Sequence, residues 1–306
     1  MNGGMTSFCI ASPHKNELWY DYRVYVNLRQ ELEALGYQYR AASQNRIYFL
    51  GGPQRHFYPE VGKFDAEANN IALIYCHVEK LKSIDQFRKV FVCSEGMKGF
   101  LQRRRLMRLE PFRRRQPFTP QAPIEVIPPF SSLQPCNRTR PRYQCDLSFV
   151  GTPRIRPILE AALPVVKSLK LKMHLYGPNW DQYPGNPVAK DYWIARSVPY
   201  EEIPMLAKGS KICLIDHHDM MNKIGTVSHK YVDFLKAGAF VISDNNRDAR
   251  KHYHGVYYRN QSELAGLIEY YVTHDAEREA TRLQQQRYLN RHSTGFAATE
   301  LAKYFI

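Results

Sequence analysis

The sequence has no long apolar run, and this absence excludes a membrane-spanning helix. No stretch comes near the roughly 18 consecutive apolar residues that such a span needs. Residues 1–7 also lack the basic stretch followed by an apolar segment that marks a secretory signal, so we expect a cytoplasmic protein. Hydrophobic residues still make up 44% of the 306-residue chain. That is enough for a folded protein of two domains.

Closely spaced cysteines and a glycine-rich phosphate loop are missing too. The absence of paired cysteines excludes the common structural zinc sites, and we predict reduced thiols in strands of the core. The loop at residues 13–16, after the first expected strand, has no glycine fingerprint, which counts against a dinucleotide-binding domain. The six cysteines are Cys9, Cys76, Cys93, Cys136, Cys145 and Cys213.

Acidic residues are few relative to basic ones. The chain has 43 Lys and Arg against 29 Asp and Glu, a net charge of +14. Such an excess fits a polyanionic partner, although it also fits a solubility device or attraction to an acidic membrane surface. The excess is local, and seven arginines form the candidate nucleic-acid contact: Arg103, Arg104, Arg105, Arg108, Arg113, Arg114 and Arg115. The alternative interpretation of this cluster is a solvated surface.

The first half of the chain alternates apolar runs with helical periodicity, as a parallel sheet does. Its expected strands are 7–12, 46–50, 70–77 and 89–94, and its expected helices are 17–36 and 95–108. Eight prolines between 111 and 141, with one strand-like piece at 124–128, then indicate a connection between domains. We place the boundary between residues 134 and 144.

The second half alternates more strictly and predicts a doubly wound parallel sheet. Its expected strands are 145–151, 171–177, 211–216, 239–244 and 256–259, and its expected helices are 154–169, 200–208, 228–238 and the segments from 262 onward. A long polar loop is expected at 217–226. No repeat of short period occurs.

The helix expected at 228–238 is the strongest candidate for a ligand site. Ser228 is a suitable N-cap, and Gly238 ends the helix before a buried strand. A helix N-terminus beside a parallel sheet attracts anions, and Lys230 would lie in its first turn with Asp233 on the same face. Together they could bind a nucleotide, with the cation near a phosphate and the carboxylate near the ribose. The alternative is a solvated pair on an ordinary surface helix.

The order of these motifs resembles the GT-B glycosyltransferases, in particular the CgeB-like branch with a glycosyltransferase family 1 C-terminal domain. The resemblance implies an α/β protein of two Rossmann-like parallel-sheet domains that face each other across a cleft. It divides the chain into 1–138, 139–290 and a C-terminal helix at 291–306 that packs back on the first domain. It is carried by residues 149–151, 175–180, 198–202, 229–244 and 264–271 with Thr294, and more loosely by 21–23, 32–36, 74–79 and 90–94.

The resemblance also implies an activity, namely transfer of a hexose from a nucleotide sugar, here expected to be a UDP-sugar, with no metal or other cofactor required. The basic residue of the helix would serve the donor phosphates and the acidic residue the ribose. This chain has Lys230 and Asp233 where Arg and Glu are expected. Backbone amides near the glycines, with Arg196 or Lys223 as supplements, would assist. The candidate donor residues are Gly151, Thr152, Tyr176, Gly177, Val198, Tyr200, Lys223, Gly225, Thr226, Ser228, Lys230 and Asp233.

An inverting transferase needs a base to remove the acceptor's proton, and this base would come from the first domain. Asp21, His14 and His77 follow expected strands there, with Asp21 slightly preferred. The alternative role of Asp21 is to stabilise a helix N-terminus, and a retaining enzyme would need no such base.

The expected acceptor is a hydroxymethylated base in double-stranded DNA, as in phages with modified genomes, in which case the protein would act in the host cytoplasm. The arginine cluster would contact phosphates while the base is flipped into the cleft. Two alternatives remain open. One is transfer to a polysaccharide, spore-coat component, protein or small molecule, and the other is a non-catalytic, polyanion-binding protein of the same fold. The oligomeric state is not predicted.

Overall fold

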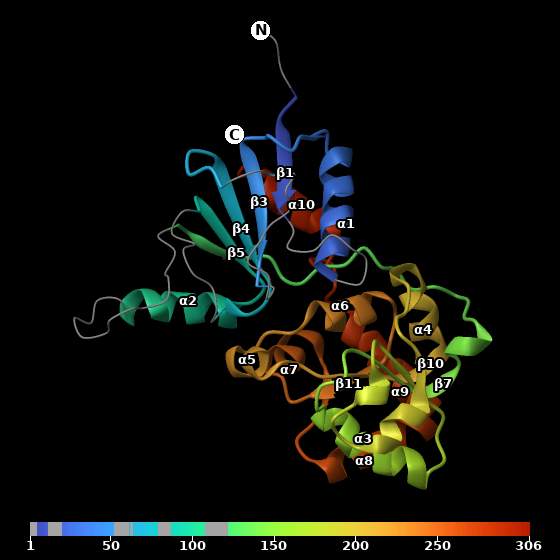
Figure 1. Ribbon diagram of the computed structural model, residues 1–306. Helices are drawn as coiled ribbons and strands as arrows, with labels where there is room; N and C mark the ends of the chain where they lie inside the picture. Colours follow the sequence, from blue (N-terminus) through green and yellow to red (C-terminus); the bar gives the residue numbers. More distant parts are fainter. Residues whose placement is uncertain (1–4, 12–19, 52–60, 62–63, 79–86, 108–121) are drawn as a thin grey trace. The chain divides into compact units, whose positions relative to one another are not determined.

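The computed structural model describes residues 5–11, 20–51, 61, 64–78, 87–107 and 122–306, with the backbone alone for helix residues 20, 21 and 104–107. The chain forms two compact units, each built on a six-stranded sheet (Figure 1). Unit 1 comprises Met1–Phe130, Ile224–Thr226 and Arg291–Ile306, and unit 2 comprises Ser131–Lys223 and Val227–Asn290. The predicted fold class, an α/β protein of two parallel-sheet domains, is confirmed. No helix within the described ranges is long and apolar enough to cross a membrane.

The sheet of unit 1 has the strand order β2-β1-β3-β4-β5-β6, with every neighbouring pair parallel. All residues of β3 and β4 are buried, as expected of strands covered on both faces. The strands are β1 (Ser7–Ala11), β2 (Gln38–Tyr39), β3 (Asn45–Leu50), β4 (Asn69–Ile74), β5 (Lys89–Val92) and β6 (Ile124–Val126). The helices are α1 (Tyr20–Ala34), α2 (Glu95–Met107) and α10 (Thr294–Ala302).

The C-terminal segment completes unit 1. Helix α10 packs against α1, and the last residues reach the amino-terminal ends of the strands. The side chain of Asn45, the first residue of β3, donates to Ile306 O (3.0 Å) and accepts from Ile306 N (2.9 Å). The ring of Phe305 stacks on Phe8 with centroids 6.1 Å apart. Residues nearly 300 positions apart in sequence therefore share one core.

The sheet of unit 2 has the order β12-β11-β10-β7-β8-β9, again all parallel. Two buried clusters of apolar side chains pack on it: one includes α3 and α8, and the other includes α4 and α6. The strands are β7 (Cys145–Val150), β8 (Met173–Tyr176), β9 (Trp193–Ala195), β10 (Ser210–Ile215), β11 (Val241–Asp244) and β12 (Val256–Tyr258). The helices are α3 (Pro157–Ser168), α4 (Ile203–Gly209), α5 (Asp219–Ile224), α6 (His229–Lys236), α7 (Arg247–Tyr253), α8 (Gln261–Thr273) and α9 (Asp275–Gln286).

Three elements differ from the sequence prediction. The segment 217–226, expected to be a loop, contains α5, because Met221 and Ile224 form a short buried face that the polar neighbours conceal. Strands β2 and β9 were not expected, since two or three residues are too few to show alternation.

Gly177, directly after β8, allows the ends of β7 and β8 to approach. Its φ is +144°, and a Cβ at this position would stand 1.9 Å from Gly151 O. That carbonyl also accepts a hydrogen bond from Trp180 Nε1 (3.1 Å). A side chain at residue 177 would therefore push two loops of the sheet's carboxyl edge apart.

We expect Gly177→Ala to lower the thermal midpoint by several degrees, equivalent to more than about 2 kcal/mol, because both the strain at positive φ and the clash with backbone must be relieved. Differential scanning fluorimetry measures the effect. Gly266→Ala is the matched control: Gly266 lies inside α8 with nothing within 4 Å of the added Cβ. This control should stabilise slightly, by about 0.5–1 kcal/mol. Equal midpoints for Gly177→Ala and the wild type would refute the close approach.

Candidate functional site

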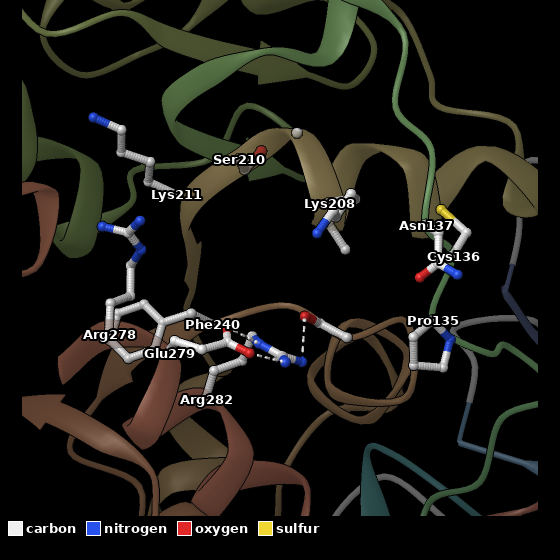
Figure 2. A pocket seen from close by; sticks show the side chains of 13 residues that line it. Pro135, Cys136, Asn137, Lys208, Ser210, Lys211, Phe240, Arg278, Glu279 and Arg282 are labelled. Carbon is white, nitrogen blue, oxygen red and sulfur yellow. Dashed lines mark hydrogen bonds and ion pairs between the residues drawn. The ribbon is translucent and has the colours of Figure 1, made fainter. Parts of the chain in front are cut away.

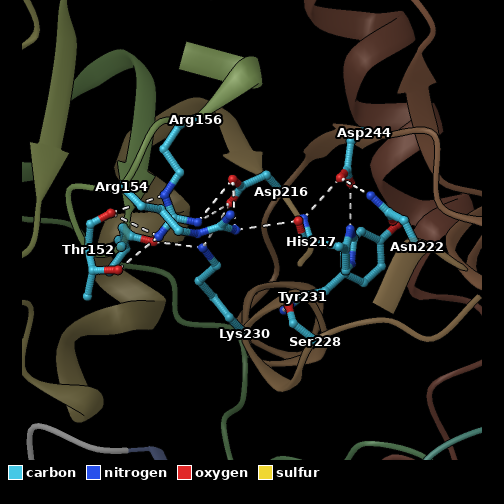
Figure 3. A network of polar contacts seen from close by, with 12 residues as sticks. Thr152, Arg154, Arg156, Asp216, His217, Asn222, Ser228, Lys230, Tyr231 and Asp244 are labelled. Carbon is cyan, nitrogen blue, oxygen red and sulfur yellow. Dashed lines mark hydrogen bonds and ion pairs between the residues drawn. The ribbon is translucent and has the colours of Figure 1, made fainter. Parts of the chain in front are cut away.

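Unit 2 changes the direction of its strand order between β7 and β10. From β7 the chain adds β8 and β9 on one side, then returns to place β10, β11 and β12 on the other. Ligands of open α/β sheets bind outside the carboxyl ends of the strands at such a switch point. The segments that leave these two ends, 151–156 after β7 and 216–217 after β10, carry a cluster of charged side chains (Figure 3).

Asp216 and Arg156 form the buried centre of this cluster. The Asp216 side chain is 3% exposed and that of Arg156 7%. Arg156 Nη1 donates to both carboxylate oxygens of Asp216, at 2.9 and 3.0 Å. Its Nε and Nη2 donate to Thr152 O at 3.0 and 2.9 Å, and Nη2 also donates to Thr152 Oγ1. The guanidinium thereby ties the loop after β7 to the end of β10.

Arg154 and Lys230 are held much more loosely around the same carboxylate. Arg154 Nη2 lies 3.5 Å from Asp216 Oδ2, and Lys230 Nζ lies 4.0 Å from Oδ1. Their side chains are 35% and 26% exposed, against 7% for Arg156. These two cations can turn toward a ligand without leaving Arg156 unpaired. They are the candidate anion-binding groups of the switch point.

Helix α6 delivers Lys230 to the site. Ser228 caps the helix, its Oγ accepting from Tyr231 N (3.3 Å), and Lys230 follows in the first turn. Lys230 Nζ donates to Val150 O (2.8 Å) and lies 4.7 Å from the centre of the Phe149 ring. Burial lowers the pKa of Lys230 to about 8, partly opposed by the charge of Asp216. The ammonium is thus still the main form at neutral pH and is lost as the pH rises through 8.

A second carboxylate, Asp244 at the end of β11, fixes the segment that carries Asp216. Asp244 accepts from the backbone N–H of His217 (3.0 Å), from Asn222 Nδ2 (2.7 Å) and from the ring of His217. Burial alone would raise the pKa of Asp244, but these hydrogen bonds hold that pKa below its usual value. The carbonyl of His217 in turn accepts from Arg154 Nη2 (3.4 Å). Figure 3 shows this network beside the Asp216 cluster.

Gly151, Thr152, Ser228 and Lys230, all predicted from the sequence, lie in or directly beside this cluster. The amide of Gly151 does not serve as predicted, since its N–H donates to Tyr176 O (2.9 Å) and cannot also donate to a phosphate. Thr152 contributes its carbonyl and hydroxyl to Arg156.

Asp233 and Tyr200 form a separate group one helical turn along α6. Tyr200 Oη donates to Asp233 Oδ1 (3.4 Å) and lies 3.2 Å from Ser131 Oγ. Burial raises the pKa of Asp233 to about 7. The carboxyl is therefore engaged within the protein and close to half protonated at neutral pH.

Other predicted donor residues lie elsewhere in the described chain. The Tyr176 ring is buried in the core, with its hydroxyl 3.2 Å from His174 Nδ1, so its side chain cannot contact a donor. Val198 packs against the same core cluster. Lys223 is exposed in the last turn of α5. Gly225, with φ of +69°, and Thr226 belong to unit 1.

Most predicted residues of the acceptor side lie outside the described residues or have undescribed side chains. In unit 1 the strand order changes between β1 and β3. His14 belongs to the segment that follows β1 and lies outside the described ranges, whereas Asp21 falls in α1 with its side chain undescribed. His77 lies three residues past β4 with φ of +45°. Of the arginine cluster, the side chain of Arg103 alone is described, and it is exposed on α2; Arg104 and Arg105 belong to that helix, while Arg108, Arg113, Arg114 and Arg115 lie outside the described ranges.

Five residues of the site were not predicted from the sequence: Arg154, Arg156, Asp216, His217 and Asp244. Their positions along the sequence could have indicated them. Each lies at or just after the carboxyl end of an expected strand, the edge where ligands bind. In the part of the chain that the structure describes, no group of three or more His, Cys, Asp or Glu side chains is placed to hold a metal ion.

Comparisons with known proteins concern the family and the fold of the chain. Residues 154–303 match the family model described as glycosyl transferase-like. No curated protein matches the chain in sequence. Solved structures that share its fold include the following three. The DNA modifying enzyme beta-glucosyltransferase, solved with and without uridine diphosphoglucose, is 13% identical, with a TM-score of 0.63 and coverage of 97% of this chain and 99% of that one. Sucrose-phosphate synthase from Thermosynechococcus elongatus is 10% identical, with a TM-score of 0.62 and coverage of 97% and 98%. An alpha-glucosyltransferase in complex with UDP-glucose and DNA containing an abasic site is 9% identical, with a TM-score of 0.57 and coverage of 98% and 99%.

The fold and the matched domain together define a class, the nucleotide-sugar glycosyltransferases of GT-B fold. Within that class, residues 154–303 belong to the glycosyl transferase-like family. The family assignment made from sequence motifs is confirmed. At such low identities the structural likeness establishes the fold and does not identify the acceptor.

Proposed function

We propose that unit 2 binds a UDP-sugar with its diphosphate against Arg154 and Lys230. The observation that carries this proposal is the pair of loosely held, partly exposed cations at the switch point between β7 and β10. Breaking the bond between sugar and diphosphate builds negative charge on phosphate oxygens. Fixed cations in a partly desolvated site stabilise that charge. Arg156 already donates hydrogen bonds to Asp216 and Thr152, so its role is to hold the loop after β7 against the end of β10.

Asp233 is proposed to accept hydrogen bonds from the ribose of the donor. Its carboxyl lies one turn along the same helix from Lys230, a spacing that suits neighbouring parts of one nucleotide. In the absence of donor Tyr200 occupies one of its oxygens. The base that activates the acceptor is proposed to come from unit 1, with Asp21, His14 and His77 as candidates.

The acceptor is proposed to be a hydroxymethylated base in double-stranded DNA. The net charge of +14 and the seven arginines between 103 and 115 support a polyanionic acceptor. Likeness over 97% of the chain to an enzyme described as DNA modifying supports the same acceptor. An enzyme that acts on a base inside a duplex must flip it out of the stack, and backbone contacts from arginine would hold the duplex meanwhile.

A transfer assay with two matched duplexes tests this proposal. We expect radiolabelled glucose from UDP-glucose to enter a duplex that contains hydroxymethylcytosine and not the same duplex with plain cytosine. Gel-shift affinity for either duplex should fall steeply with salt, because counterions are released on binding. Neutral replacement of Arg103, Arg104 and Arg105 by Gln should weaken the gel shift while leaving the affinity for UDP-glucose unchanged. No duplex binding at low salt would rule out a DNA acceptor.

A second candidate is transfer to a carbohydrate or other small acceptor. It is favoured by the likeness to sucrose-phosphate synthase, whose TM-score of 0.62 is nearly that of the DNA modifying enzyme. Donor hydrolysis without transfer to DNA, together with turnover on a sugar acceptor, would select it. Absence of any stabilisation by UDP-sugars in a thermal-shift screen would instead favour a binding protein that has lost catalysis.

A further inference from the structure

Unit 2 contains a cavity at the edge of its sheet opposite the switch point. The cavity has a volume of about 350 Å³ and is lined where β10 begins, by residues 207–211, and also by residues 135–137, Gly238, Phe240 and three side chains of α9. Asp216, in contrast, follows the carboxyl end of β10. Six strand residues, roughly 20 Å at about 3.3 Å each, separate the two places. The cavity is therefore distinct from the proposed donor site.

The lining is strongly basic. Lys208, at the end of α4, lies on the same side of the view as Arg282 and Glu279 of α9, whereas Lys211 and Arg278 lie together at the left, and Glu279 supplies the sole carboxylate of the lining (Figure 2). Four cations against one anion around a partly enclosed space create a positive potential. Low-dielectric walls focus it on the cavity. Such a lining favours an anionic ligand.

The cations are only partly neutralised by the protein itself. Lys208 is exposed and makes no ion pair or hydrogen bond with any residue that the structure describes. Lys211 pairs with Asp146 (3.0 Å) and Arg278 with Asp275 (2.7 Å), both carboxylates outside the lining. Arg282 pairs with Glu279. Partly exposed ion pairs of this kind are worth about 0.2–1 kcal/mol, so a ligand with two negative charges can rearrange them.

The shape of the cavity favours a small ligand over a nucleic acid. A volume of about 350 Å³ suits a molecule the size of a sugar phosphate. The Arg278 side chain is only 16% exposed, so a convex duplex could reach Lys208 but not all the cations together. Glu279 and the amide of Asn137, also on the lining, can hydrogen-bond to hydroxyl groups.

We propose that this cavity binds a small phosphorylated ligand, a phosphomonoester whose phosphate contacts Lys208, attracted by the positive potential of the other three cations, and whose hydroxyl groups contact Glu279 and Asn137. The ligand would occupy unit 2 together with the nucleotide sugar, because the two sites lie at opposite edges of one sheet. The inference is independent of the proposed function.

Isothermal titration calorimetry with glucose 6-phosphate and with inorganic phosphate tests the proposal on the full chain, in excess UDP so that the donor site does not contribute. We expect saturable binding that Lys208→Glu weakens by about tenfold or more, because a charge-assisted hydrogen bond becomes a repulsion. Arg278→Gln should weaken it as well. Lys190→Glu is the matched control, since Lys190 is exposed on unit 2 outside the cavity and carries the same charge change.

Two results would overturn the proposal: equal phosphate affinity in Lys208→Glu and the wild type, or binding of a 20-base-pair duplex through Lys208 without binding of either phosphate. Thermal midpoints guard against misfolding, and we expect a small fall in the midpoint of Lys208→Glu, because Lys208 lies in the last turn of α4 and its charge acts favourably on Glu279. If UDP itself fails to bind, the proposed function fails while the comparison of cavity variants still stands.

Discussion

Lys230→Met is expected to weaken donor binding and at the same time to raise the thermal midpoint. Lys230 supplies one of two loosely held cations for the diphosphate, and a charge-assisted hydrogen bond contributes about 1.5–3 kcal/mol, so the Kd for UDP-glucose should rise about 10- to 100-fold. The charge of this ammonium nevertheless destabilises the folded protein. Burial is the largest influence on it, and Arg154 and Arg156 repel it. An apolar side chain of similar length removes that cost and should raise the midpoint by a few degrees.

The pH dependence of the wild type follows from the same residue. In the unfolded chain Lys230 has the ordinary lysine value of 10.5, and in the folded protein its pKa is lowered to about 8. Its destabilising effect is thus fully present below pH 8 and disappears as the pH rises toward 10.5. The advantage of Lys230→Met in thermal midpoint should shrink over that window. Donor affinity of the wild type should fall as the pH rises through 8, because the ammonium is lost.

Lys236→Met, at the other end of α6, is the matched control for the measurement of donor affinity. Lys236 is partly buried and lies in the last turn, away from the cluster. Its replacement should leave the Kd for UDP-glucose unchanged. A Lys230→Met protein that binds UDP-glucose as tightly as the wild type would mean that the switch point does not hold the diphosphate.

Asp216→Asn is expected to produce the largest loss of stability of any single change in unit 2. The substitution keeps the shape of the side chain but leaves the buried guanidinium of Arg156 without its counter-charge, next to two further cations. Removing one partner of a buried ion pair costs about 3–5 kcal/mol. For a unit of this size that corresponds to a fall in midpoint of about 10 °C, measured by circular dichroism or calorimetry.

The double variant Asp216→Leu with Arg156→Met separates this explanation from simple damage to packing. Replacing both members of a buried pair by apolar groups is often nearly neutral, so the double variant should recover most of the midpoint lost by Asp216→Asn. Asp146→Asn is the control, because the Asp146 pair with Lys211 is partly exposed and should be worth less than about 1 kcal/mol. A double variant as unstable as the single one would contradict a charge-based account.

The fold and the site differ in how far the sequence predicts them. Buried strands such as β4 and β10 contain apolar runs, at 71–74 and 212–215, and Ser228 and Gly238 mark the two ends of α6. These strands and the helix were therefore predicted correctly, whereas the short strands β2 and β9 were not. Local sequence determines such features. The strand order does not, and it is the strand order that makes β7 and β10 neighbours and brings Arg156 to Asp216, sixty residues away. Residues that acquire their role only from that pairing were therefore missed.

Side-chain roles within a correctly predicted helix also depended on the tertiary structure. Lys230 and Asp233 share a helix face, as expected from their spacing. Lys230 reaches the carboxyl edge of β7, whereas Asp233 meets Tyr200 and the segment at Ser131. The spacing in the sequence predicts on which face of the helix the two side chains lie. It does not predict their contacts, because the contacting residues belong to elements far away in the chain.

The return of residues 291–306 to unit 1 has a consequence for synthesis on the ribosome. Helix α10 and the strand-end contact between Asn45 and Ile306 are translated only after the whole of unit 2. Unit 2, which is made of the segments 131–223 and 227–290, can bury its sheet while unit 1 still waits for one of its helices. The nascent chain therefore carries an amino-terminal sheet without the helix α10 until residues 294–302 have been made. During that interval the surface of α1 that α10 will cover stays uncovered.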